Sequence, residues 1–313
     1  MKYSNIALEV LAAKECGLIK SNAQFWKNFH EIDLFRENTY KNSDFLKTLE
    51  NLSYQFDGIS NDGGFICIYD DEFPIINKNV KNSGDKPYLL FYKGNLTLLN
   101  NLNNNIAVIG LVDPDEEIMK RETEIVKQLV NKGLIIVSGL AKGCDTVAHK
   151  VCLEEYGKTI AILSTPIDRV YPATNKLLAK EIVNRNGLLL SEYYKEPYNR
   201  NEAIKRLIDR DRLQAMFAKA VILIASYQYG KGDSGSRHAM EAAKKFAVER
   251  YVMFNLKTDN INIKFGLNRE YLLNTNDSIN ILQQSSIEYI KFLENKDLIK
   301  NKSDMLIEQL SIF

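Results

Sequence analysis

At 313 residues, the chain is long enough to bury one large core, or a main core with small satellites. Apolar residues make up 45% and charged residues 26%, which is the balance of an ordinary globular protein. The net charge is only +1, which excludes a protein that binds nucleic acid through a strongly basic overall field. Any such binding must use a local patch of cations.

The N-terminal segment and the cysteines bear on location. The early apolar run is interrupted by Glu9, Lys14 and Glu15, which favours an amphipathic helix over a signal peptide. No stretch approaches the roughly 18 uncharged apolar residues of a membrane span. The cysteines are Cys16, Cys67, Cys144 and Cys152, and none forms a C-x-x-C pair. We therefore expect a reducing, cytoplasmic location without membrane contact.

Residues 1–62 are predicted to form a small helical module. An apolar helix starts at Ile6 and ends at Gly17, a second surrounds Phe25 to Phe29, and a third covers residues 45–54. Trp26 is expected in the core of this module. A helix-hairpin-helix DNA-binding module is an alternative interpretation, although the Gly-x-Gly hairpin of such modules is absent.

Residues 63–275 are predicted to form one doubly wound α/β domain. Two lead-in strands are expected at 65–69 and 87–92, and residues 95–105 should form a turn and short helix. Further strands are expected at 106–109, 134–137, 159–163, 188–190, 221–225 and 251–254. Helical patterns lie at 116–131, 145–155, 176–186, 201–217 and 235–247. Continuous apolar strands that alternate with amphipathic helices are typical of a parallel sheet covered on both faces.

Residues 276–313 are predicted to form a short helical tail, with helices at 281–294 and 304–310. In a doubly wound domain, ligands bind at the carboxyl ends of the strands. The loops that follow the predicted strands are therefore the place to look for a site.

The loop at 138–145 is the more specific of two candidate anion-binding loops. Gly139 and Gly143 bracket Lys142 between a strand and a helix, so backbone N–H groups and the helix N-terminus can face an anion. Asp145 is predicted to cap the helix, and its spacing to His149 predicts an i, i+4 contact. A structural role that locks this loop is favoured for His149 over a catalytic one.

The second candidate anion-binding loop covers residues 226–236, where three glycines, serines and Lys231 precede a helix. Gly110, after the first core strand, allows close backbone approach, and Asn175 is a candidate helix cap at the end of a long loop. The window 192–231 carries a net charge of +3 from eight Lys/Arg and five Asp/Glu, but taken alone it is better explained as a solvated helix face, because Asp209 and Asp211 dilute the charge.

Other chemistries find little support. Cys144 and His149 lie about 140° apart on a helix and lack further ligands, so no metal site is expected. No nucleophile elbow of the G-x-S-x-G kind is present.

These loops together resemble the DNA-processing protein A (DprA, or Smf) family. The matching stretches are SGLAKGCDTVAH (138–149), KTIAILSTPIDRVYPATN (158–175), LLLSE (188–192), RDRLQA (210–215) and SGSRHAMEAA (234–243). DEFP (71–74) and KPYLLFYKG (86–94) resemble the family's lead-in segment. The resemblance covers about residues 65–256.

The resemblance implies an extended Rossmann fold that binds single-stranded DNA without catalysis or a cofactor. It also implies a homodimer that hands DNA to a RecA-type recombinase, typically during natural transformation by competent cells. The DNA-contacting or phosphate-contacting positions that it implies are Gly110, Ser138, Gly139, Lys142, Gly143, Asn175, Lys176, Arg210, Arg212, Ser234 and Gly235. Asp145 and His149 are expected as structural support.

The sequence departs from the family pattern at several positions. Gly110 is followed by Leu111 and Val112 instead of Ser/Thr and Arg, the family's Arg-Asn-Arg is Arg210-Asp211-Arg212, and Pro166 replaces a glycine. The family's winged-helix module is absent or reduced to the tail. The alternative is a nucleotide-binding sensor or nucleotide hydrolase of the wider superfamily, which could serve a defence system. A third is an interaction scaffold that uses the helical ends.

Overall fold

The computed structural model describes residues 2–57, 63–232, 235–274 and 278–282. The chain divides into two compact units. Unit 1 comprises Met1–Leu102 and Ile160–Arg210, and unit 2 comprises Asn103–Thr159 and Asp211–Phe313. Each unit is described by itself.

The N-terminal part of unit 1 is helical. Its helices are α1 (Asn5–Glu15), α2 (Asn22–Asn28), α3 (Ile32–Thr39) and α4 (Ser43–Phe56). The helices α1, α2 and α4 confirm the predicted ones, and each begins where a Ser or Asn side chain accepts a hydrogen bond from a first-turn backbone N–H. The sequence analysis missed α3, whose N-cap residue Glu31 makes no such bond.

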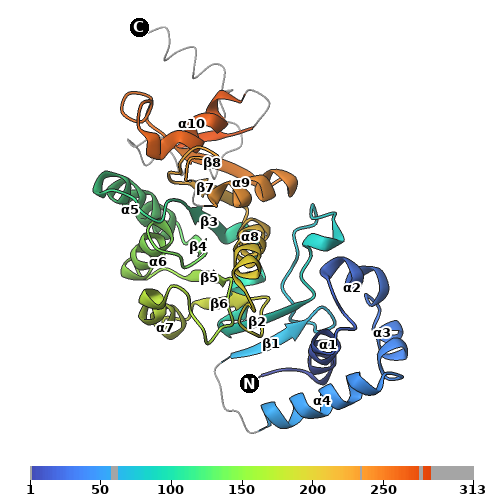
Figure 1. The fold of residues 1–313 in the computed structure, drawn as a ribbon. Helices are drawn as coiled ribbons and strands as arrows, with labels where there is room; N and C mark the ends of the chain where they lie inside the picture. Colours follow the sequence, from blue (N-terminus) through green and yellow to red (C-terminus); the bar gives the residue numbers. More distant parts are fainter. Residues whose placement is uncertain (1, 58–62, 233–234, 275–277, 283–313) are drawn as a thin grey trace. The chain divides into compact units, whose positions relative to one another are not determined.

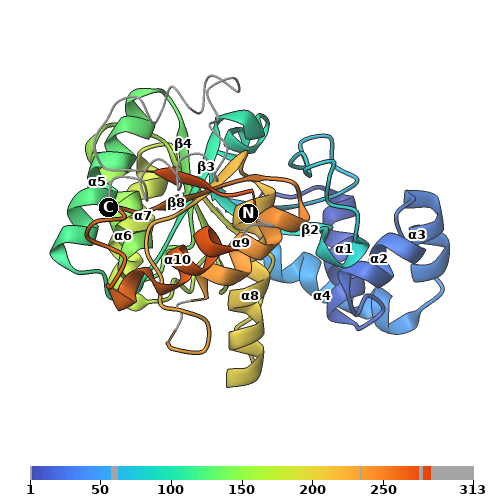
Figure 2. The same cartoon turned by 90° about the horizontal axis from the view of Figure 1, so that it is seen from above.

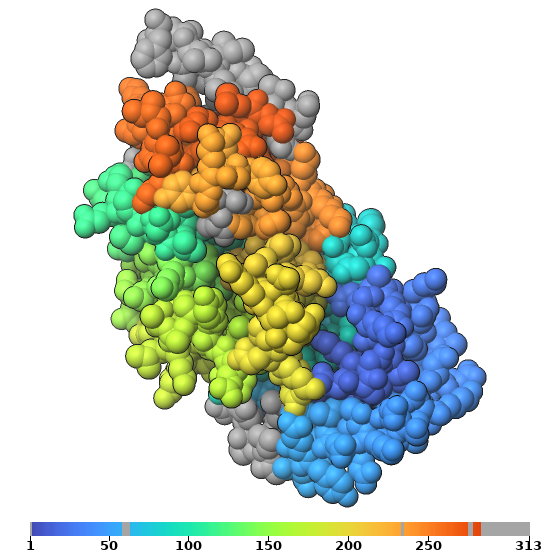
Figure 3. All heavy atoms as spheres, in the orientation of Figure 1, coloured from blue at the N-terminus to red at the C-terminus, as the bar shows by residue number. Residues whose placement is uncertain are grey.

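The four helices share a core with the strands that follow them. Phe25, Phe35 and Phe45 are fully buried, and the same cluster includes Phe65 and Phe91 from the sheet. Figure 3 shows the four helices (blue) as one continuous surface. Trp26, expected in the core, lies at its edge and stays half-buried.

The strands of unit 1 are β1 (Gly63–Cys67), β2 (Leu89–Gly94), β5 (Thr159–Leu163) and β6 (Leu188–Ser191). They lie in the order β1-β2-β6-β5, with β2 antiparallel to both β1 and β6, and β5 parallel to β6. The helix α7 (Lys176–Asn184) packs against β6. The helix α8 (Arg200–Met216) begins in unit 1 and ends in unit 2.

Unit 2 holds a parallel sheet in the order β4-β3-β7-β8-β9. Its strands are β3 (Asn105–Ile109), β4 (Ile135–Ser138), β7 (Ala220–Leu223), β8 (Glu249–Met253) and β9 (Asn280–Leu282). The helices are α5 (Glu116–Asn131), α6 (Cys144–Glu154), α9 (Ser236–Lys245) and α10 (Gly266–Leu273). The helices α5 and α6 cover one face of this sheet and α9 the other (Figures 1 and 2).

Short 3-10 helices complete the described elements: η1 (Ser83–Asp85), η2 (Leu96–Leu99), η3 (Leu102–Asn104), η4 (Ala173–Asn175) and η5 (Ile263–Phe265). No helix in the described ranges combines the length and apolar character that crossing a membrane would need.

The α/β fold, with a mostly parallel sheet, is confirmed, and each predicted core strand and helix between 106 and 254 is present. The prediction of a helix at 281 is wrong: Ile281 lies in β9, which pairs in parallel with β8 and buries Leu282. The rest of the predicted helical tail lies outside the described residues. The predicted domain boundaries at 62 and 275 stay a prediction.

Candidate nucleic-acid interface

Three loops of unit 2 follow neighbouring parallel strands. They are the β3–α5 loop (110–115), the β4–α6 loop (139–143) and the β7–α9 loop (224–235, described except for 233–234). Because β4, β3 and β7 are adjacent in the sheet, these loops share its carboxyl edge. That edge is where ligands of doubly wound sheets bind.

The β3–α5 loop packs tightly against the start of α6. A Cβ on Gly110 would lie 2.6 Å from the Cys144 Sγ, and one on Gly143 would lie 2.2 Å from the Leu111 carbonyl oxygen. The Cys144 N–H donates to the same Leu111 oxygen at 2.9 Å. The close backbone approach that both glycines allow is therefore used by the protein itself.

Inside the β4–α6 loop, a carboxylate of the chain takes the place expected for a bound anion. Asp145 Oδ2 accepts hydrogen bonds from the backbone N–H groups of Gly139 and Ala141, at 3.2 and 3.1 Å. The prediction that Asp145 caps the helix is wrong, because Gly143 occupies the N-cap position with φ 71°. Ser138 is also internal, since its hydroxyl donates to the Val108 carbonyl at 2.7 Å.

Lys142 is the cation that this loop presents to solvent. Its side chain is exposed, between the buried Leu140 and the helix start. Within the parts of the chain that are described, no hydrogen bond or ion pair holds its ammonium group. The Gly139 and Ala141 amides are bound to Asp145, whereas the Lys142 side chain is exposed and can reach an external anion.

A buried acid lies behind the loop. Glu122 of α5 is fully buried against the Cys144 thiol. Burial raises the pKa of Glu122 well above its usual range, and the nearby Asp145 raises it further. Burial and Glu122 likewise raise the pKa of Cys144, so its thiol is held protonated and unreactive.

His149 ties α6 to the sheet. Its Nδ1 lies 2.7 Å from the Thr159 hydroxyl, which donates its own proton to the Ile136 carbonyl at 2.8 Å. The Thr159 oxygen must therefore accept from His149, which assigns the neutral tautomer with Nδ1–H. Burial lowers the pKa of His149 to about 3. A neutral, fully buried ring is consistent with the expected supporting role. The hydrogen bond to Thr159 holds the ring in place, and not the predicted contact with Asp145.

The β7–α9 loop ends at Gly235, which is the N-cap of α9 with φ 84°. A Cβ there would lie 3.5 Å from Asp211 Oδ2. A second carboxylate of the chain thus stands beside a predicted anion position. The adjacent Ser236 hydroxyl donates to the Gly110 carbonyl at 3.2 Å, which links this loop to the β3–α5 loop. The predicted contact Ser234 lies outside the described residues.

The sequence analysis passed over an aromatic–cation pair in this loop. The Arg237 guanidinium lies over the Tyr229 ring at 4.3 Å from its centroid, and the ring is 61% exposed. Arg237 also pairs with Glu241 at 2.7 Å. The sequence contains a signal for this pair, because Tyr229 precedes the glycines and Arg237 lies two residues after the helix cap Gly235.

Lys264 is a second cation that the sequence analysis missed. Its ammonium donates to the Asp113 carbonyl at 2.7 Å and lies 3.7 Å from the Asp115 carboxylate. The Tyr227 hydroxyl donates to Asp113 Oδ2 at 2.9 Å, and this bond raises the Tyr227 pKa. Lys264 therefore places one ammonium group at the acidic β3–α5 loop.

The remaining predicted contacts fall on both units. In unit 1, Lys176 is exposed, whereas Asn175 is buried and sits at the N-cap of α7 without a side-chain cap bond. Arg210 of unit 1 and Arg212 of unit 2 are half-buried, and both have partners in the protein. In the parts described, no cluster of three or more His, Cys, Asp and Glu side chains is placed to hold a metal ion.

The fold and these loops define a class: an α/β protein of Rossmann-like topology with cations at the carboxyl edge of a parallel sheet. Residues 64–264 match the family model of "DNA recombination-mediator protein A", and the chain belongs to this family.

Curated relatives include DNA processing protein DprA of Streptococcus pneumoniae, which is 45% identical over 109 residues, 35% of this chain and 37% of the relative. The DprA of Bacillus subtilis is 30% identical over 157 residues, half of each chain. The matched part of the chain thus spans about a third to a half of the length of these relatives.

Solved structures of the same family resemble the fold of this chain. The chain superposes on the X-ray structure of DprA from Streptococcus pneumoniae with a TM-score of 0.68 and 27% identity, over 93% of this chain and 98% of that one. It also superposes on DNA processing protein A from Helicobacter pylori, in a structure that describes a single-stranded DNA binding mode. That TM-score is 0.58, with 25% identity over 74% of this chain and 94% of that one.

Proposed function

We propose that this protein binds single-stranded DNA, without catalysis, at the carboxyl edge of its parallel sheet. The observation that carries the proposal is the exposed Lys142 at the β4–α6 loop, on the same edge as the Tyr229–Arg237 pair. Cations that contact phosphates beside an exposed aromatic ring are the common design of single-strand binding sites. The related Helicobacter pylori protein binds single-stranded DNA.

Two of the chain's own carboxylates modify this design. Asp145 occupies the amides of the β4–α6 loop, and Asp211 stands at the start of α9. Phosphate contact at this edge therefore depends on side-chain cations more than on the backbone amides that the sequence analysis favoured. The contacts of Gly110, Ser138, Gly139, Gly143, Asn175, Lys176, Arg210, Arg212, Ser234 and Gly235 with DNA stay predictions.

Membership of the family supports a proposal for the cellular role. We propose that the protein acts in the cytoplasm, as a homodimer, in DNA processing and recombination. On this proposal it delivers the strand to a RecA-type recombinase during natural transformation.

The test is a binding titration with labelled oligodeoxythymidylates of several lengths. Fluorescence anisotropy of the label measures binding at several salt concentrations. We expect affinity that rises with strand length and falls steeply with salt. Lys142→Gln should weaken binding and lower the salt slope by about one. Lys150→Gln is the matched control, because Lys150 is an exposed lysine of the same α6 segment, away from the loop.

Two results would speak against the proposal. The first is an unchanged anisotropy for long strands at low salt. The second is saturable thermal stabilisation by a mononucleotide together with indifference to strand length, which would identify a sensor or hydrolase pocket for a free nucleotide.

A further inference from the structure

A cavity lies within unit 1. It has a volume of about 300 Å³ and is bounded by Trp26 of α2 and by the connection between β1 and β2. Two hydrogen bonds hold α2 to this connection: the Trp26 Nε1 donates to the Lys86 carbonyl at 3.0 Å, and the Asn22 Nδ2 donates to the Gly84 carbonyl at 3.4 Å. The walls of the cavity are therefore fixed against each other.

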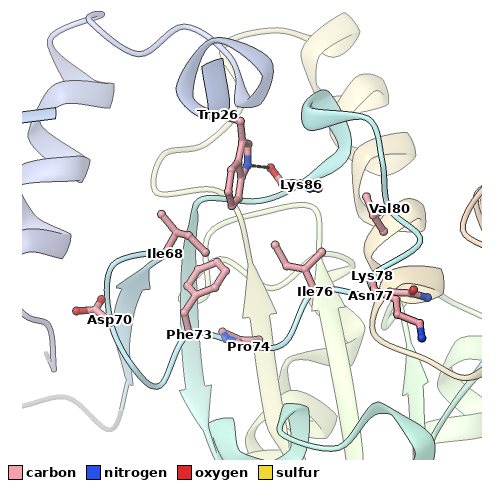
Figure 4. Close-up of a pocket in the computed structure, with 10 residues that line it drawn as sticks. All are labelled: Trp26, Ile68, Asp70, Phe73, Pro74, Ile76, Asn77, Lys78, Val80 and Lys86. Atoms are coloured by element: carbon pink, nitrogen blue, oxygen red, sulfur yellow. Dashed lines mark hydrogen bonds between the residues drawn. The ribbon is translucent and has the colours of Figure 1, made fainter. Parts of the chain in front are cut away.

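The interior of the cavity is aromatic and aliphatic. Figure 4 shows the Trp26 indole pointing into it from above, with Phe73, Ile68 and Ile76 facing the indole from the β1–β2 connection. The hydrogen bond from Nε1 holds the indole by its edge. Two aromatic rings on opposite walls suit a planar aromatic group that can contact ring faces.

The charge at the rim is positive. The Lys86 ammonium lies 5.4 Å from the centre of the Trp26 ring, and Lys78 is exposed at the rim. The acid of the lining, Asp70, accepts a hydrogen bond from the Cys67 N–H at 2.8 Å, and it points away from the cavity in Figure 4. The lining thus includes two lysines, and its carboxylate does not point inward.

A planar aromatic group with an adjacent anion matches both features. We propose that this cavity binds one nucleobase, with Lys86 and Lys78 on its phosphate. The proposal rests on the proposed function, since a single strand would supply the base as a second contact outside the sheet edge. Ligand pockets range from roughly 300 to 1,000 Å³, so a cavity at the lower end admits one nucleotide and not two. An apolar peptide side chain would use the aromatic walls but gain nothing from the two lysines.

The sequence provides a direct reporter, because Trp26 is the single tryptophan of the chain. The experiment is a titration of the full-length protein with deoxythymidine monophosphate and, in parallel, with labelled oligodeoxythymidylate. Tryptophan emission reports on the cavity, and anisotropy of the label reports on total strand binding. Free N-acetyltryptophanamide corrects for absorption and for collisional quenching.

We expect saturable quenching of the Trp26 emission in both arms. Equal concentrations of mononucleotide and strand at half-saturation would identify a free nucleotide as the source of the base, and a much lower strand concentration would identify single-stranded DNA. Phe73→Leu keeps the apolar bulk but removes stacking, so it should weaken the emission response roughly fivefold or more.

Lys86→Gln should weaken the emission response and lower its salt slope by about one. Lys81→Gln is the matched control, because Lys81 belongs to the same connection, bonds the Lys78 carbonyl at 2.9 Å and does not line the cavity. An equal effect of Lys81→Gln and Lys86→Gln would overturn the assignment of Lys86.

The two readouts separate the two proposals. A clear anisotropy change without any change in Trp26 emission would overturn the cavity proposal and leave the proposed function intact. Saturable quenching by the mononucleotide without strand binding would support the cavity and overturn the proposed function. Emission that neither ligand changes would overturn the cavity proposal, whatever the anisotropy shows.

Discussion

The Asp211 carboxylate stands at the start of α9, with its Oδ2 3.5 Å from the position that a Cβ would take on Gly235. The N-terminus of a helix carries a partial positive charge, which stabilises a nearby anion. Asp211 is itself buried and accepts a hydrogen bond from the Gln214 amide at 3.0 Å, so it is held in place. Its negative charge competes with any phosphate at this end of the helix.

Asp211→Asn should therefore strengthen binding to single-stranded DNA. The amide keeps an oxygen for the Gln214 bond but removes the charge. Removal of a repulsion of about 1 kcal/mol corresponds to roughly a fivefold lower Kd. The measurement is an anisotropy titration at low salt. Asp209→Asn, two residues earlier, is the control, because Asp209 accepts from the Tyr193 hydroxyl and an asparagine can do the same. Equal affinities for wild type and Asp211→Asn would refute this account of the loop.

A second prediction concerns the packing of the β3–α5 loop. Gly143→Ala should destabilise the protein because the added Cβ would meet the Leu111 carbonyl oxygen at 2.2 Å and the backbone is at φ 71°. Gly133→Ala is the control, since Gly133 has φ 74° but nothing within 4 Å of an added Cβ. The positive φ alone costs about 1–2 kcal/mol. The clash should cost about 1–3 kcal/mol more.

The measurement for this pair is the free energy of unfolding by urea denaturation. If both variants lose the same stability, the contact between the β4–α6 and β3–α5 loops is loose, and Gly110 and Gly143 are free to approach a ligand after all.

The sequence predicts the regular part of the fold because strands and helices there follow local patterns. The helix α5 begins and ends at the predicted residues, and Asp115 caps it through the Ile118 N–H. The helix α3 was missed because Glu31 provides no such cap bond. The strand β9 was missed because its three residues join the sheet only through pairing with β8. A strand this short carries no periodicity of its own.

The candidate site could be located from the sequence, but its internal contacts could not. The glycines and Lys142 identify the loop, since their spacing is local. The proximity of Asp211 to Gly235 depends on how α8 and α9 pack in unit 2, and no local pattern connects residues 24 positions apart. The same is true of Trp26 and Lys86, which meet across 60 positions.

The last prediction concerns pH. The pKa of His149 is lowered to about 3 in the folded protein by burial, against a usual value of 6.5. Between these values the unfolded chain binds a proton that the folded protein excludes, so stability rises with pH through this window and is lost as pH falls from 6.5 towards 3. The slope from this residue can reach about 1.4 kcal/mol per pH unit. Glu122 acts with the opposite sign, because its raised pKa makes the folded protein hold a proton that the unfolded chain releases above pH 4.5.

The variant His149→Asn separates the pH dependence due to His149 from that due to Glu122. The asparagine amide can take over the Nδ1–H bond to the Thr159 hydroxyl but does not titrate. We expect the stability difference between wild type and variant to be constant above pH 7 and to shift in favour of the variant as pH falls from 6.5 to 5. Urea denaturation of both proteins across this range measures it. A difference that does not change with pH would mean that His149 is protonated as easily in the folded protein as in the unfolded chain. Burial of the ring would then not lower its pKa.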